Sequence, residues 1–222
     1  SIGRINVQPA SVDEHLLYNG DDLGSTVRDG RTTFRVWAPT AAQVTLKFFT
    51  GGEREIPMAP DRDGTWVTAF DGSLHGSEYR YRVLVDGAWR EAVDPYGRTS
   101  TVNGEHSVVV ELPRTDPQRW EAAKPPFSGE LVDAVFYELH TRDFSIDPSS
   151  GVSESARGKW LALTEHGTKT PSGNRSGIDH IREMGITHLQ LLPIYDFGSV
   201  DELDATQYNW GYDPVQYNVP EG

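Results

Sequence analysis

The sequence contains no cysteine, which excludes disulfide bonds, thiolate nucleophiles and cysteine-based zinc sites together. Positive charge is also scarce: 20 lysines and arginines stand against 33 aspartates and glutamates, so the net charge is -13. An acidic surface repels phosphate backbones and anionic lipids. We therefore expect neither nucleic acid nor a membrane as a partner, whereas a neutral polysaccharide is indifferent to this charge.

Long apolar runs and an initiator methionine are missing as well. No run approaches the roughly 20 residues that cross a bilayer. The chain begins SIGRINVQPA, without an apolar signal core. We expect residues 1–15 to be a linker from a missing upstream region, with Ser1 as a cut end. The compartment stays open, because a secreted protein of this size can do without disulfides.

Short strands and turns fill residues 16–112. Apolar residues alternate in TFRVWAPTAAQVTLKFF and in SEYRYRVLVDG, and Asp86-Gly87 is a two-residue hairpin turn. Turn signals recur about every ten residues, a spacing typical of an immunoglobulin-like β-sandwich. The residues expected to share the inner faces are Phe34, Val36, Ala38, Val44, Leu46, Phe48, Tyr79, Tyr81, Val83 and Val85.

A proline-rich stretch at residues 113–130 is the expected linker to a second region, residues 131–222. There the pattern changes to an apolar run at Leu131–His140, a long polar loop, a helix from Ser176 to Gly185 and a second apolar run at Ile186–Pro193. We expect a capping box between Ser176 and Asp179. Strand, helix and strand in this order predict one parallel βαβ unit, with both strands buried on both faces.

Metal sites find little support in the sequence. The seven histidines show no ligand spacing. The segment Asp61–Gly64 resembles part of a calcium loop, but it lacks the first ligand and the closing glutamate, which favours a hairpin turn. We predict no metal ligand from these patterns.

The aromatic residues leave two interpretations open. In the strands, Trp37, Trp66 and Trp89 are expected to pack in the core, although Trp37 and Trp89 fall off the apolar phase and are the better candidates for a surface role. The final stretch, YNWGYDPVQYNVPEG, shows no helix or strand period. Its rings and its polar residues Asn209 and Asp213 suit a sugar, since a ring stacks on a pyranose and the polar groups take its hydroxyls. A loop that merely covers its surroundings explains them as well.

The heptapeptide YNWGYDP at residues 208–214 resembles the hallmark motif of type I pullulanases, starch-debranching members of the α-amylase family, glycoside hydrolase family thirteen. AVFYELHTRDFSI and GIDHIREMGITHLQLLPIYDF resemble the start of their barrel. TFRVWAPTAAQVTL and DPYGRTSTVNGEHSVVV resemble the starch-binding-type module that precedes it. The resemblance implies a β-sandwich followed by the first βαβ unit of an incomplete (β/α)₈ barrel.

The resemblance also implies a retaining hydrolysis of α-1,6-glucosidic bonds in pullulan, amylopectin and branched dextrins. The family takes its nucleophile and acid from later barrel strands, so we expect no catalytic carboxylate in these 222 residues and no activity of this chain alone. Tyr212 matches the tyrosine that stacks under the sugar at subsite −1. Substrate-binding roles are expected in addition for Asp213, Asn209, Trp210 and Tyr208, whereas Asp143 is interpreted as structural, paired with Arg142.

We therefore expect part of a bacterial starch-debranching hydrolase whose partners are α-glucan and the remaining C-terminal part of the same enzyme. No cofactor is required; a structural calcium ion in the complete enzyme is left open. An extracellular location is favoured over a cytoplasmic one. Two alternatives remain: a non-catalytic α-glucan-binding module, and another debranching or branching enzyme of the α-amylase family.

Overall fold

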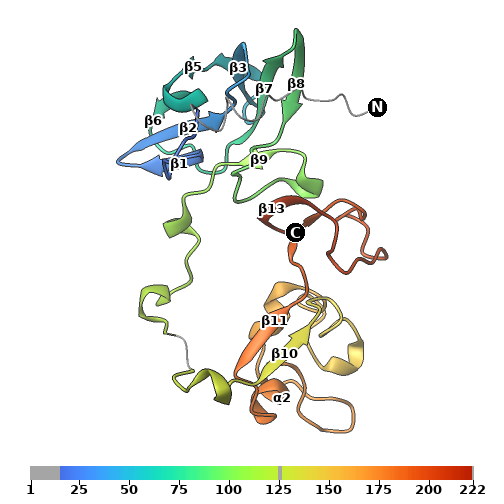
Figure 1. Cartoon of the computed structure of the whole chain (residues 1–222). Helices are drawn as coiled ribbons and strands as arrows, with labels where there is room; N and C mark the ends of the chain where they lie inside the picture. The colour runs from blue at the N-terminus through green and yellow to red at the C-terminus, as the bar shows by residue number, and fades with distance from the viewer. Residues whose placement is uncertain (1–15, 125–126, 222) are drawn as a thin grey trace. The chain divides into compact units, whose positions relative to one another are not determined.

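The computed structural model describes residues 16–124 and 127–221 (Figure 1). The chain divides into two compact units. The first, here called unit 1, runs to Pro117 and also includes Tyr195–Gln207 and the residues from Asp213 on; unit 2 comprises Gln118–Ile194 and Tyr208–Tyr212. The expected linker at residues 1–15 lies outside the described residues.

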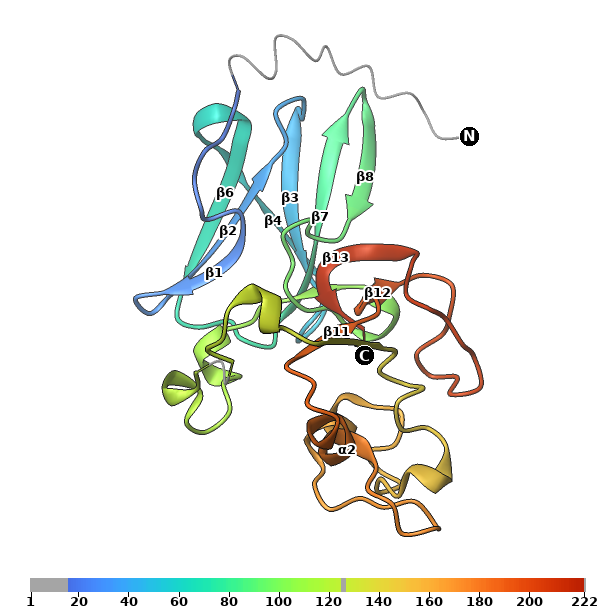
Figure 2. The ribbon, with the colours of Figure 1, turned by 60° about the horizontal axis from the view of Figure 1, so that its bottom comes forward.

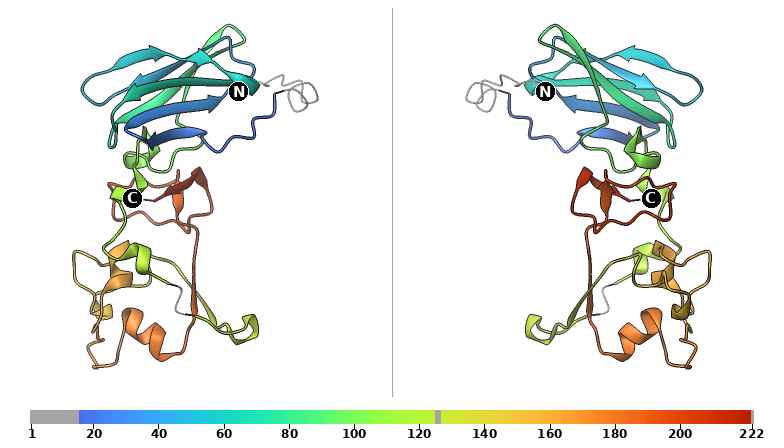
Figure 3. Two further views of the ribbon diagram at one scale, coloured as in Figure 1. Left: turned by 90° about the vertical axis from the view of Figure 1, so that its left-hand side faces the viewer. Right: turned by 90° about the vertical axis from the view of Figure 1, so that its right-hand side faces the viewer.

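Two antiparallel sheets form the sandwich-like module of unit 1 (Figures 2 and 3). One sheet has the order β1-β2-β6-β5. The other has the order β4-β3-β7-β8, with β9 paired to β7. The strands are β1 Gly24–Arg28, β2 Arg31–Trp37, β3 Gln43–Phe48, β4 Arg54–Pro57, β5 Ala59–Pro60, β6 Thr65–Asp71, β7 Glu78–Val85, β8 Ala88–Ala92 and β9 Ser107–Val108.

The core between these sheets follows the predicted alternation. Phe34 of β2 is fully buried, and its ring meets those of Phe48 and Tyr79 edge to face, with centroids 5.5 and 4.9 Å apart. Such pairs add to the free energy gained from apolar burial. The predicted hairpin turn is confirmed as well: Asp86 and Gly87 both have positive φ, as a type I′ turn requires.

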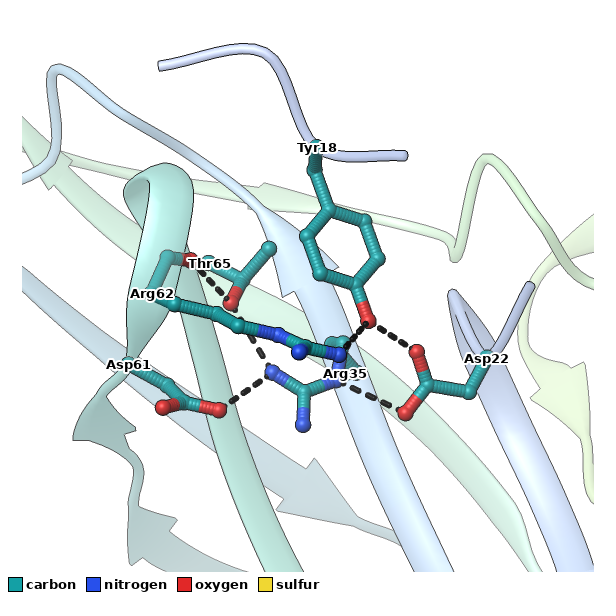
Figure 4. Close-up of polar contacts among 6 residues, drawn as sticks. All are labelled: Tyr18, Asp22, Arg35, Asp61, Arg62 and Thr65. Carbon is teal, nitrogen blue, oxygen red and sulfur yellow. Dashed lines mark hydrogen bonds and ion pairs between the residues drawn. The ribbon is translucent and has the colours of Figure 1, made fainter. Parts of the chain in front are cut away.

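A buried arginine joins the segment before β1 to the sandwich (Figure 4). Arg35 donates to Asp22 and Asp61, at 3.0 and 2.6 Å, and to Thr65 Oγ1 at 2.9 Å. Its guanidinium carbon lies 5.4 Å from the centroid of the Tyr18 ring. Because Arg35 is only 8% exposed, these carboxylates compensate for the loss of water around its charge.

A hairpin of β12 (Tyr195–Phe197) and β13 (Pro214–Pro220) belongs to unit 1, because Gln216 Nε2 donates to Gly104 O, 3.1 Å away. The expectation that the final stretch has no strand was wrong. Its regular alternation is lost because the β12–β13 register shifts twice and Asn218 has a φ of 72°. The hairpin also means that residues 131–222 do not fall into one unit.

Unit 2 contains a parallel strand pair, β10 (Phe136–Leu139) and β11 (His188–Leu191), joined through the helix α2 (Gly177–Glu183). The strands are shorter than predicted: residues Leu131–Asp133 form a 3₁₀ turn instead of extending β10. The prediction that both strands are buried on both faces was wrong for this chain, since Phe136 of β10 is 63% exposed. A two-stranded sheet has too few neighbours to cover its own strands.

The helix α2 begins after Ser176 and is followed by Gly185 in the left-handed region, as predicted. The predicted capping box was wrong. Ser176 Oγ donates to Ser150 O, and Asp179 accepts from the backbone N–H of Gly167 at 2.6 Å instead. Asp179 thus fixes the end of the long polar loop.

That loop carries its own small core. Val152, Ala156 and Ala162 are buried against one another. In the described ranges, 16–124 and 127–221, no helix has both the length and the apolar character that a bilayer crossing requires.

Candidate functional site

The candidate sugar-binding residues of unit 2 lie at the carboxyl end of its parallel strands. His140 and Asp143 follow β10, and Tyr208–Tyr212 lie downstream of β11. Parallel strands end at the same edge of a sheet, so residues that follow them meet there. Two side-chain contacts connect the two segments.

The first contact is a hydrogen bond from the Tyr208 hydroxyl to Asp143 Oδ2, 2.6 Å long. It raises the pKa of Tyr208, because ionisation would place two negative charges side by side. The Arg142 guanidinium lies 5.5 Å from the Tyr208 ring centroid and 3.7 Å from Asp143 Oδ1. Asp143 therefore pairs with Arg142 as predicted, and it also orients the first ring of the motif.

The second contact comes from His140, which the sequence did not single out. Its Nε2 lies 2.8 Å from the carbonyl oxygen of Asn209. A carbonyl only accepts, so Nε2 carries the proton. His140 Nδ1 then accepts from the backbone N–H of Asp143 at 3.3 Å. The His140 ring thus contacts both segments through its two nitrogens. The signal in the sequence that could have identified His140 is its position at the end of a predicted strand.

A tight turn at Asn209–Gly211 sets the course of the chain through the motif. Asn209 Oδ1 accepts from the backbone N–H of Gly211 at 2.6 Å. Gly211 has a φ of 84°, and a Cβ there would lie 2.3 Å from Pro193 O. Only glycine fits this close approach of two backbones. The side chain of Asn209 therefore stabilises this turn.

The two remaining rings of the motif are exposed. Trp210 is 61% and Tyr212 is 65% exposed. Exposed aromatic faces with polar groups beside them can stack on a neutral sugar ring. Tyr208, Asn209, Trp210 and Tyr212 are thus brought together in unit 2. The fifth expected residue, Asp213, is placed in unit 1, where its carbonyl accepts from the Gly198 N–H at 3.3 Å.

The tryptophans of the sandwich differ from one another. Trp66 packs against the core. Trp37 is 38% exposed but donates from Nε1 to Leu16 O and Asp63 O, at 2.8 and 3.1 Å, which fixes it in place. Trp89 is 40% exposed, with the Arg82 guanidinium 4.8 Å from its ring centroid. The expected core position was wrong for Trp37 and Trp89, the two tryptophans that fall off the apolar phase of their strands; a role of either in binding sugar stays a prediction.

Comparison with known proteins connects both units to one kind of enzyme. Residues 22–97 match the sequence profile of carbohydrate-binding module 48, the isoamylase N-terminal domain. The chain is 42% identical to the pullulanase of Bacillus subtilis over 97% of its own length and 30% of that protein.

Solved structures of pullulanases are also similar to this chain. A pullulanase from Paenibacillus barengoltzii in complex with maltohexaose and α-cyclodextrin is 46% identical, with a TM-score of 0.89 over 96% of this chain and 34% of the other. The pullulanase from Bacillus acidopullulyticus is 44% identical, with a TM-score of 0.88 over 94% of this chain and 26% of the other. Residues 22–97 are thus similar to carbohydrate-binding module 48, and the whole chain is similar to pullulanases, of which it spans about a third or less of the length.

Proposed function

We propose that this chain is the N-terminal portion of a type I pullulanase, an enzyme that hydrolyses α-1,6-glucosidic bonds in pullulan and branched α-glucans. The observation that carries the proposal is the 42% identity across 97% of the chain. That match includes the sandwich-like module as well as the heptapeptide at residues 208–214. A likeness confined to the module would support only glucan binding.

Residues 131–222 begin a (β/α)₈ barrel in this proposal. The support is the parallel pairing of β10 with β11 and the helix α2 between them in the sequence, which is the repeating unit of such a barrel. The exposed side chains of Phe136 and Tyr137 on β10 are apolar surface that further barrel elements would cover. The remaining C-terminal part of the enzyme is thus one proposed partner.

The chemistry divides between the two parts of the enzyme. Retaining hydrolysis needs a nucleophile and an acid with carboxyl groups about 5 Å apart. We place both in the later barrel strands, outside these 222 residues. This chain supplies substrate contacts at the carboxyl end of β10 and β11, where the residues of a barrel enzyme bind their substrate. Tyr212 stacks on the sugar whose bond is cleaved, and its neighbours hold it in position.

Product analysis tests the proposal. The complete protein that carries this chain should convert pullulan into linear maltotriose, because it cleaves the α-1,6 bonds and leaves the α-1,4 bonds intact. Chromatography of the digest against linear standards identifies the product. A branching enzyme would instead transfer chains without net release of reducing ends, and that result would contradict the proposal.

A second candidate function is α-glucan binding by the sandwich without any part in catalysis. The match to carbohydrate-binding module 48 and the exposed ring of Trp89 favour it. Calorimetry of the whole chain with maltohexaose separates the two. A micromolar dissociation constant that is lost in Trp89→Ala would favour the second candidate; we expect the module to add little affinity for short oligosaccharides.

A further inference from the structure

Three carboxylates of unit 1 converge outside the candidate sugar site. Asp196 lies in β12, Glu202 in the loop that follows, and Glu221 directly after β13. One oxygen from each lies within 4.8 Å of the others. Oxygens that bind a calcium ion lie 2.3–2.6 Å from it, so two of them are at most about 5 Å apart. The spacing therefore suits three ligands of one ion.

Hydrogen bonds position the chain segments that carry Glu202 and Glu221. Asn103 Oδ1 accepts from the backbone N–H of Glu202 at 2.9 Å, and Asn103 Nδ2 donates to Asp201 at 2.9 Å. The backbone N–H of Phe197 donates to Glu221 Oε2 at 3.1 Å. The cluster is thus built on the β12–β13 hairpin and on the 3₁₀ turn η2 (Val102–Gly104), which belong to the same unit.

Asp196 supplies an independent sign of a missing ligand. It is 1% exposed. Its Oδ2 accepts from Gln216 Nε2 at 2.7 Å, but its Oδ1 is buried and has no hydrogen-bond partner. Gln216 is 6% exposed, and its Oε1 is likewise buried without a hydrogen-bond partner. A buried carboxylate oxygen without a partner costs several kcal/mol in an apolar environment, and a cation would supply the missing interaction.

The charges of the ligand set agree with this geometry. Carboxylate groups this close to one another repel when they are ionised, and a bound cation relieves the repulsion.

We propose that Asp196, Glu202 and Glu221 bind one calcium ion. The ligand set consists of carboxylate oxygens alone, which selects a hard cation over zinc or copper. Calcium accepts six to eight oxygens in flexible geometry, whereas magnesium requires a near-ideal octahedron at 2.0–2.1 Å. The partly exposed Glu202 and Glu221 leave water access for the remaining positions. The ion would link β12, the loop that follows it and the residue after β13, and would so stabilise unit 1. This inference is independent of the proposed function.

Titration of the chelator-treated 222-residue chain with calcium chloride tests the proposal. Isothermal calorimetry should give one calcium ion per chain, and thermal unfolding should shift to higher temperature as the ion is added. Asp196→Asn should weaken the affinity at least about tenfold, because it removes one of three charged ligands. Glu105→Gln, the loss of an exposed carboxylate next to η2, should leave it unchanged.

Asp196 is buried, so its replacement could prevent folding. Glu202→Gln is the second variant, because Glu202 is partly exposed. Circular dichroism would first establish that it is folded, and its calcium affinity should fall to the same extent. Absence of saturable one-to-one binding by the parent chain would overturn the proposal. So would an unchanged affinity in the folded Glu202→Gln chain.

Discussion

Tyr212 is the residue on which the proposed substrate contact depends most. It is 65% exposed at the end of a turn that His140 and Asn209 hold in place. The face of an aromatic ring favours the positive charge that develops on the sugar, by about 1–2 kcal/mol when water is excluded. Its neighbours in the motif also make structural contacts, so replacing them would test the substrate contact less specifically.

Tyr212→Ala in the complete enzyme should lower kcat/KM for pullulan about tenfold or more, because the stacked ring is lost. Tyr212→Phe keeps the ring and should cost much less. Steady-state kinetics on pullulan would measure both. Two variants as active as the parent would show that Tyr212 does not contact the reacting sugar.

Gly211 allows a separate test of the turn. An alanine there adds the cost of a left-handed backbone, about 1–2 kcal/mol, and a Cβ 2.3 Å from Pro193 O. Gly173 has the same φ of 84° with nothing within 4 Å of its Cβ position. Gly211→Ala should therefore reduce the free energy of unfolding by more than Gly173→Ala does, as measured by urea denaturation. Equal effects would mean that the close approach to Pro193 carries no cost.

At the scale of elements, the sandwich strands could be predicted because one face of each is buried, and burial imposes a period of two. The same reasoning failed for β13, where Asn218 and two register shifts break the alternation. It also failed at Leu131–Asp133, whose apolar composition suggested a strand. An apolar run indicates burial in a completed fold, and it does not fix where strand pairing begins.

The ion pair between Arg35 of β2 and Asp61, which follows β5, has a pH dependence that can be derived. The hydrogen bond from Arg35 lowers the pKa of Asp61 below its usual value of 3.8. A lowered pKa in the folded state means that the stabilisation is present above pH 3.8 and is lost as the pH falls below it. Asp61→Asn should therefore destabilise the chain clearly at pH 7 and much less at about pH 2.

Denaturation of the parent and Asp61→Asn at both pH values would check this. The same difference in unfolding free energy at both would show that the Asp61–Arg35 pair does not contribute through its charge. A loss that grows toward low pH would reverse the sign of the argument.

At the scale of the whole molecule, the sequence predicted the similarity to pullulanases better than it predicted how the candidate site is built. The heptapeptide identified Tyr208–Tyr212, but the roles of His140 and Gly211 depend on hydrogen bonds and a backbone approach that join segments far apart in the chain. The carboxylate cluster was missed for the same reason. Asp196, Glu202 and Glu221 have no motif spacing and converge only through the irregular hairpin.

The central claim is that Tyr212 and its neighbours in the heptapeptide bind the glucan, while the reacting carboxylates lie elsewhere in the enzyme. The most direct measurement is release of reducing sugar from pullulan by the purified 222-residue chain, alone and mixed with the remaining C-terminal part of the same protein. We predict no hydrolysis by the chain alone, and release of maltotriose when both parts are present. Hydrolysis of pullulan by the chain alone, above the level of contaminating enzymes, would contradict the account.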